Sequence, residues 1–255
     1  MKLLIQKEKD EKQQFQKHLE FSLFSFIEEI SPLYQEEKQE LFEKISLFQQ
    51  EHSFLKQKSI LEIISKSDWE TYHSKLLADF WNNYHSIFCD FIQSITKLSE
   101  NKQLIKWILE RDYKVETEQK TGNNKYIDIL ITDNQERYCI AVENKINSAV
   151  SYHGKETLQL DSYSKHIYKS MPENTQKIFL LLSFCDNKKY TLKNEWIYVD
   201  YYKVFKSIDK NYSAEDDILK QYMITLFSLL FNTKEIGGNI NEKTSLSEMS
   251  FFIKT

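Results

Sequence analysis

Three charged residues lie within two largely apolar segments, residues 127–132 and 138–145, of the stretch IDILITDNQERYCIAVENK. They are Asp128, Glu143 and Lys145. Two carboxylates can share a divalent cation, and a nearby ammonium can hold a water molecule or stabilise negative charge. Together they could hydrolyse a phosphodiester. This chemistry requires that the fold bring the three side chains to one place.

The stretch predicts a β-hairpin with its turn at residues 133–136. Partners across the hairpin then have numbers that sum to about 271, so Asp128 lies opposite Glu143. Lys145 is two residues further and shares the face of Glu143. The other face is apolar and carries Ile127, Ile129, Ile131, Ile140 and Val142. A register slip of one residue would separate the charged groups.

Two facing carboxylates repel, and one keeps its proton unless a cation lies between them. Mg²⁺ prefers oxygen ligands, uses one or two carboxylates, and keeps water in its other positions. Asp128, Glu143 and the backbone carbonyl of Asn144 offer such a set. The alternative is a solvated strand face on which Lys145 makes a surface ion pair of little energetic worth.

The neighbours of these residues favour the metal site. An aspartate on one strand and E-x-K on the next resemble the PD-(D/E)XK nuclease superfamily, with Ile127 where its name has proline. Residues 126–131 (YIDILI), 142–146 (VENKI) and 159–163 (QLDSY) resemble a bacterial branch of that superfamily. In its pattern, R-I-D-I-L-I and I-E-N-K-I are followed by a glutamine and a tyrosine on a helix.

The resemblance implies a metal-dependent nuclease that uses Mg²⁺, with Mn²⁺ as a substitute. DNA is the expected substrate, RNA is the alternative, and defence against foreign DNA is a role by analogy only. Gln159 and Tyr163 share one helical face, which the resemblance places at the active site. A further acidic ligand is expected from Glu70, with Glu116 and Glu118 as rivals. The alternative function is a catalytically inactive subunit of the same fold that binds nucleic acid or assembles with a partner.

The surrounding pattern predicts a mixed α/β domain of the restriction-endonuclease-like type, in which helices flank a central sheet of four or five strands. Apolar residues recur at helical spacing through residues 1–100 and 104–110. Residues 177–184 (KIFLLLSF) are continuously apolar and predict a central strand covered on both faces. Further strands are predicted at 114–118, 126–133, 138–146 and within 196–205, and further helices at 157–168 and 214–231.

We expect three parts along the chain. Residues 1–60 form a helical N-terminal appendage, residues 61–232 the nuclease-like domain, and residues 233–255 a C-terminal tail. The N-terminal helices are expected to bind a protein partner or to self-associate.

Composition excludes several other classes. The chain has only 4 glycines and lacks G-x-x-x-x-G-K and G-x-G-x-x-G, which argues against phosphate-cradling nucleotide loops. Its 3 cysteines are widely spaced and predict neither a zinc site nor a disulfide framework. No stretch of 18 apolar residues predicts a membrane span. We therefore expect a cytoplasmic protein without membrane contact.

Overall fold

The computed structural model describes residues 39–40, 42–121, 125–153, 157–184, 187–213 and 216–231. The chain divides into two units, residues 1–53 with 246–255, and residues 54–245. In the first unit, residues 42–51 are helical. The helices predicted for residues 1–38 and the tail predicted for residues 233–255 lie outside the described residues. The predicted domain boundaries at residues 60 and 232 stay predictions.

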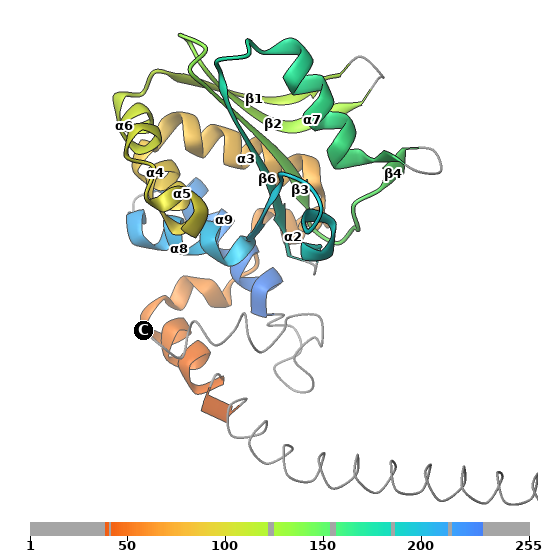
Figure 1. The fold of residues 1–255 in the computed structure, drawn as a ribbon. Coiled ribbons are helices and arrows are strands. Elements are labelled where there is room, and N and C mark those ends of the chain that lie inside the picture. Colours follow the sequence, from red (N-terminus) through yellow and green to blue (C-terminus); the bar gives the residue numbers. More distant parts are fainter. Residues whose placement is uncertain are drawn as a thin grey trace, which may run out of the picture. The chain divides into compact units, whose positions relative to one another are not determined.

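The second unit is built around a five-stranded mixed sheet (Figure 1). Its strand order is β1-β2-β3-β6-β7. β2 is antiparallel to both of its neighbours, β1 and β3. β6 is parallel to both of its neighbours, β3 and β7. The strands are β1 (Tyr113–Lys120), β2 (Tyr126–Asp133), β3 (Tyr138–Lys145), β6 (Gln176–Ser183) and β7 (Ile197–Asp200). The predicted mixed architecture and the central position of β6 are confirmed.

The register of the β2–β3 hairpin is the one that the sequence predicts. Ile129 pairs with Val142, so the partner numbers sum to 271. In the turn, the Glu136 N–H donates to the Asp133 carbonyl at 3.0 Å, and Glu136 adopts a left-handed φ of 56°. The Asp133 carboxylate accepts the Gln135 N–H at 3.0 Å, which fixes the turn locally. Asp128 therefore lies one step beyond the last pair of this ladder.

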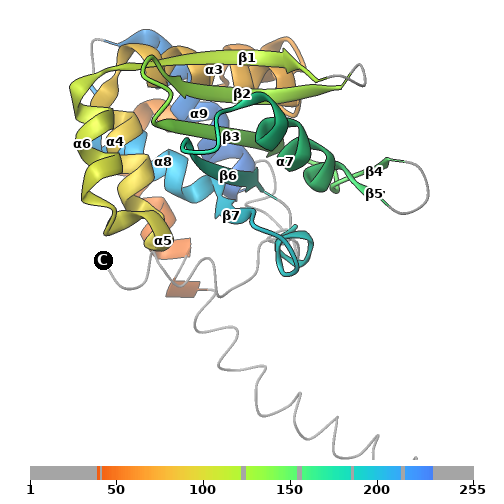
Figure 2. The same ribbon diagram turned by 45° about the horizontal axis from the view of Figure 1, so that its top comes forward.

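Helices cover both faces of the sheet (Figures 1 and 2). Helix α3 (Glu70–Asn83) contacts β1, β2 and β3 on one face. Helix α7 (Gln159–Ser170) packs on the other face, with Leu160, Tyr163 and Ile167 among buried side chains of β2, β3 and β6. These two helices carry the polar residues that reach the end of β3.

The remaining helices are η1 (Ser53–Lys56), α2 (Ile60–Ile63), α4 (His85–Ser94), α5 (Thr96–Ser99), α6 (Lys102–Glu110), η2 (Lys188–Thr191), α8 (Tyr201–Asn211) and α9 (Asp217–Phe231). Of these, α2, α4, α5, α6, α8 and α9 contact other helices, and η2 contacts β7. Helix α4 contacts α6 and α8, and α8 contacts α9. None of the described helices is both long and apolar enough to cross a membrane.

The strand predicted within residues 196–205 is confirmed as β7, whereas one predicted helix differs from the structure. β7 ends at Asp200, whose carboxylate caps helix α8 by accepting the Tyr202 N–H. The helix predicted from residue 157 begins at Gln159. Before it stands a short hairpin, β4 (Tyr152–His153) with β5 (Thr157–Leu158), which the sequence pattern did not predict.

Candidate active site

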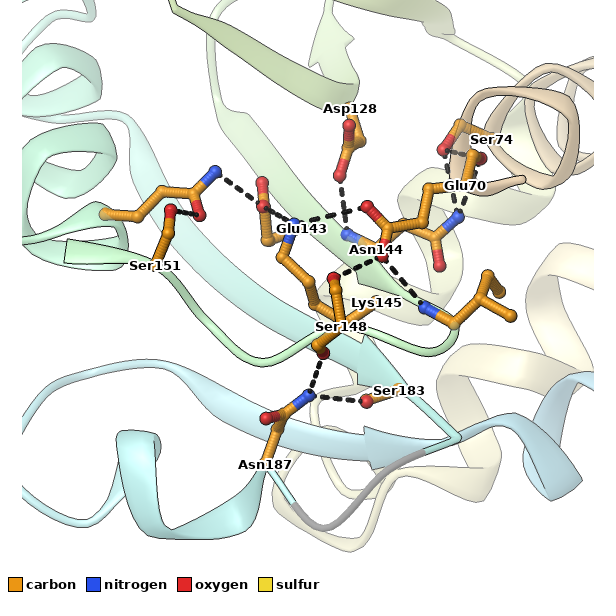
Figure 3. Close-up of polar contacts among 12 residues, drawn as sticks. Glu70, Ser74, Asp128, Glu143, Asn144, Lys145, Ser148, Ser151, Ser183 and Asn187 are labelled. Atoms are coloured by element: carbon orange, nitrogen blue, oxygen red, sulfur yellow. Dashed lines mark hydrogen bonds and ion pairs between the residues drawn. The ribbon is translucent and has the colours of Figure 1, made fainter. Parts of the chain in front are cut away.

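The charged residues meet where β2 and β3 separate. Beyond the Ile129–Val142 pair, the Asn144 N–H donates to Asp128 Oδ2 at 2.7 Å (Figure 3). A side-chain carboxylate thus takes the place of a main-chain acceptor. In a strand, the N–H and C=O of one residue point to the same side, so the Asn144 carbonyl also faces this gap.

Glu143 is almost fully buried, with 1% of its surface exposed. Its Oε1 accepts from Lys145 Nζ at 2.7 Å and from Gln159 Nε2 at 2.7 Å. Its Oε2 is also buried and has no hydrogen-bond partner within the part of the chain that the structure describes. A buried carboxylate oxygen without a donor is costly, so this atom is suited to an external positive partner.

The electrostatics of the two carboxylates follow from their burial. Burial raises the pKa of Glu143 well above its usual range, the charge of Asp128 raises it further, and Lys145 opposes both. Burial also raises the pKa of Asp128 to about 6, against the Asn144 N–H and the Lys145 charge, which lower it. Without a cation, the pair therefore holds a proton more readily than free carboxyls do, and a bound cation would take the place of that proton.

Lys145 is buried but charged. Burial alone would lower its pKa, but the charge and hydrogen bond of Glu143, followed by the charges of Glu70 and Asp128, raise it. Lys145 Nζ lies 3.4 Å from Glu70 Oε2. Glu70 Oε1 accepts the Ile146 N–H at 3.2 Å and the Ser148 hydroxyl at 2.6 Å. The structure thus brings Glu70 to the site, with three donors on its carboxylate.

Helix α7 supplies the polar neighbours of Glu143. Gln159 Nε2 donates to Glu143 and also to the Tyr163 hydroxyl at 2.9 Å. Gln159 Oε1 accepts the Ser151 hydroxyl at 2.8 Å, which fixes the orientation of the amide. Burial raises the pKa of Tyr163 to about 12, so its hydroxyl stays protonated at neutral pH. The Gln–Tyr face of the helix therefore borders the two carboxylates.

Comparison with known proteins agrees with this geometry. A model of the PD-(D/E)XK nuclease superfamily matches residues 58–227, more than half of the chain. The chain belongs to the PD-(D/E)XK nuclease superfamily. Neither a search of curated proteins nor a search of solved structures found a significant match.

Asn144, the middle residue of the E-x-K triplet in this PD-(D/E)XK chain, also has a structural role. The Asn144 side chain points to the α3 face, where its Nδ2 donates to Ser74 Oγ at 3.0 Å and to the Glu70 carbonyl at 3.1 Å. Its Oδ1 accepts the Tyr201 hydroxyl at 2.6 Å. Sequence reasoning predicted only the carbonyl of Asn144 as functional. It missed Tyr201, because nothing in the local sequence links residues 144 and 201.

The two rival acidic residues lie elsewhere. Glu116 forms an ion pair with Lys114 at 2.6 Å, and Glu118 forms one with Lys75 at 3.5 Å. Neither contacts Asp128 or the E-x-K triplet in the hydrogen bonds and ion pairs of the described residues. The structure therefore brings Glu70, and not its rivals, beside the two carboxylates.

Nucleases of this superfamily generally use divalent metal ions. Among the described residues, no three His, Cys, Asp or Glu side chains form a ready metal cage. Mg²⁺ does not need one, because one or two carboxylates with water satisfy it. Asp128, the unpartnered Oε2 of Glu143 and the Asn144 carbonyl fit such an ion. Metal binding by Glu70 stays a prediction.

Proposed function

We propose that this chain is a Mg²⁺-dependent deoxyribonuclease, with Mn²⁺ able to substitute. Asp128 and Glu143 would hold the ion with the Asn144 carbonyl. The observation that supports this most directly is the buried, unpartnered Oε2 of Glu143 beside a second carboxylate. When bound, the metal would acidify a water molecule and neutralise charge on the scissile phosphate.

The protein's own groups supply the remaining steps. Lys145 stays charged, so its Nζ can hold the attacking water or the negative charge that develops on a phosphate oxygen. Gln159 binds Oε1 of Glu143, which leaves Oε2 directed to the ion. The Tyr163 hydroxyl accepts a hydrogen bond from Gln159 Nε2 and so holds the Gln159 amide in place. Asn144 ties the strand to α3 and α8, so the triplet stays rigid.

The proposed substrate and the proposed biological role rest on membership of the superfamily and not on a contact in the structure. We propose DNA as the substrate and RNA as the alternative, because the same chemistry serves both. We further propose a cytoplasmic role in bacterial defence, with residues 1–60 binding a partner or a second copy.

Cleavage assays test the proposal. The purified protein is incubated with supercoiled DNA, linear DNA and RNA, with Mg²⁺, with Mn²⁺ or with EDTA. We expect metal-dependent cleavage of DNA, a loss of about 100-fold or more in Glu143→Gln and Lys145→Ala, and normal activity in Glu110→Gln, whose exposed ion pair with Lys106 lies on α6.

The alternative, an inactive subunit that binds nucleic acid, predicts a different set of results. It predicts a stable complex with DNA or RNA, no cleavage with either metal, and the same binding in Glu143→Gln. Full cleavage by Glu143→Gln would contradict the proposed mechanism. Calorimetry with Mn²⁺ gives an independent reading, because Asp128→Asn should bind the ion at least about tenfold more weakly than wild type.

A further inference from the structure

Ser148, in the segment that follows β3, is held at both of its polar ends. Its hydroxyl donates to Glu70 Oε1 at 2.6 Å, and its carbonyl accepts Asn187 Nδ2 at 3.1 Å (Figure 3). Asn187 is 2% exposed and also donates to Ser183 Oγ at 2.9 Å. The segment after the catalytic strand is therefore fixed to helix α3 on one side and to the end of β6 on the other.

These contacts form a closed ring that includes Lys145. Lys145 and Ser183 are direct partners in the parallel β3–β6 ladder. From Ser183 the contacts run through Asn187 and Ser148 to Glu70, and Glu70 Oε2 returns to Lys145 Nζ at 3.4 Å. We call Ser183, Asn187, Ser148 and Glu70 the clamp. They come from three parts of the chain: α3, the segment after β3, and the end of β6 with the residues that follow it.

The clamp decides how Glu70 meets Lys145. Oε1 of Glu70 is taken by the Ser148 hydroxyl and the Ile146 N–H, which leaves Oε2 for the lysine. Lys145 Nζ is thus shared between Glu143 at 2.7 Å and Glu70 at 3.4 Å. Without this second acceptor, Glu143 would be the single carboxylate in contact with the ammonium among the residues that the structure describes.

We propose that Ser148 and Asn187 are positioning residues for the nuclease reaction, because they hold Glu70 where it is a second acceptor for Lys145 beside Glu143. This inference rests on the proposed function. In it, Glu70 orients the lysine and is not a ligand of the metal. The alternative for Glu70 is direct metal binding, and the two roles give different results in a metal titration.

Kinetics of Ser148 variants test the positioning role. Ser148→Ala removes the hydroxyl and should lower kcat about tenfold, with KM for DNA and the Kd for Mn²⁺ within about twofold of wild type. Ser148→Thr keeps the hydroxyl and should restore most of kcat. The matched control is Ser99→Ala, at an exposed serine of α5 whose hydroxyl donates to the Thr96 carbonyl at 3.0 Å.

Two further variants test the path. Asn187→Asp replaces the Nδ2 donor by an acceptor and should lower kcat as Ser148→Ala does. In the double variant Ser148→Ala with Glu70→Gln, kcat should fall no further than in Glu70→Gln alone, because residues that act in one path are not additive. Additive losses would show that Ser148 acts by another route and would overturn the proposal.

Two measurements do not depend on cleavage. In Ser148→Ala the Ile146 amide, which donates to Glu70, should exchange with deuterium about tenfold faster, while the amide of Glu136 in the β2–β3 turn is unchanged. Unchanged exchange at Ile146 would contradict the clamp. Calorimetry with Mn²⁺ alone should give Glu70→Gln a Kd close to that of wild type, and a loss of more than about tenfold would make Glu70 a metal ligand and overturn the proposed role.

Failure of the proposed function is distinguishable from failure of the clamp. A wild-type protein that cleaves no nucleic acid would refute the nuclease proposal and, with it, the catalytic effect assigned to Ser148. Active wild type with undiminished kcat in Ser148→Ala would leave the nuclease intact and refute the clamp alone.

Discussion

Replacing Asp128 by asparagine should stabilise the metal-free protein at neutral pH while it weakens metal binding. Burial raises the pKa of Asp128 from 3.8 to about 6, so its ionised form is disfavoured in the folded state. Asparagine has nearly the same shape and keeps an oxygen that can accept the Asn144 N–H. The variant therefore removes the cost of the buried charge and keeps the contact that joins β2 to β3.

The size of the effect follows from the pKa. A shift of this size corresponds to about 3 kcal/mol at pH values above the folded-state pKa. The neutral amide oxygen accepts more weakly than a carboxylate, which costs roughly 1 kcal/mol. We therefore expect the free energy of unfolding at pH 8 to rise by about 2 kcal/mol in Asp128→Asn.

The pH dependence has a definite sign. The folded-state pKa of Asp128 is raised, so its favourable contribution is complete below about pH 4 and is lost as the pH rises through about 6. The asparagine variant has no such loss. Its advantage over wild type should therefore grow between pH 4 and pH 6 and stay constant above that range.

Urea unfolding in EDTA at pH 4.5, 6 and 8 measures this difference directly. The comparison of two proteins at one pH cancels the titration of groups that do not interact with Asp128, and the remaining difference includes the change in the pKa of Glu143, which the Asp128 charge raises in wild type. A variant that is less stable than wild type at pH 8 would refute the reasoning, because it would mean that the ionised carboxylate stabilises the fold. Added Mn²⁺ should favour wild type, since it binds wild type more tightly than Asp128→Asn and therefore stabilises it more.

Two other predictions concern buried polar groups. Gln159→Ala removes a hydrogen bond to Glu143 and should lower single-turnover cleavage about 10- to 100-fold with unchanged DNA binding; an unaltered rate would exclude the assigned role. His73 is buried and bonds the Tyr222 hydroxyl and the Ser67 carbonyl. Burial lowers the pKa of His73 to about 4, so the free energy of unfolding should fall by about 3 kcal/mol as the pH falls from 6.5 to 4. An NMR titration of His73 with its midpoint at 6.5 would contradict this.

The hairpin could be predicted from sequence because its signals are local. Alternating apolar residues define the strands, and the Asp133 turn defines the register, so the approach of Asp128 to Glu143 followed from counting. The Gln159–Tyr163 spacing was equally informative, because residues four apart share a helical face. These parts of the site depend on contacts within a short length of chain.

The remaining features depend on contacts between distant segments. The tie from Asn144 to Tyr201 joins positions 57 residues apart, and no periodicity reports it. The same holds for Ser148 with Asn187, at 39 residues. The sequence predicted a strand within residues 196–205 but not its end, because the Asp200 carboxylate that caps helix α8 at Tyr202 was not recognised as a cap. Sequence patterns identify elements well and report poorly on which polar side chains meet.

The two-sided tethering of the E-x-K triplet bears on enzyme engineering. Glu143 accepts a hydrogen bond from Gln159 of α7, whereas the side chain of Asn144, the next residue, is hydrogen-bonded to α3 and α8. A grafted copy of Asp128 and the triplet alone would carry the reactive groups to a new scaffold without their anchor. A graft should therefore include counterparts of Ser74 and Tyr201, so that the strand that carries the triplet stays anchored in the new scaffold.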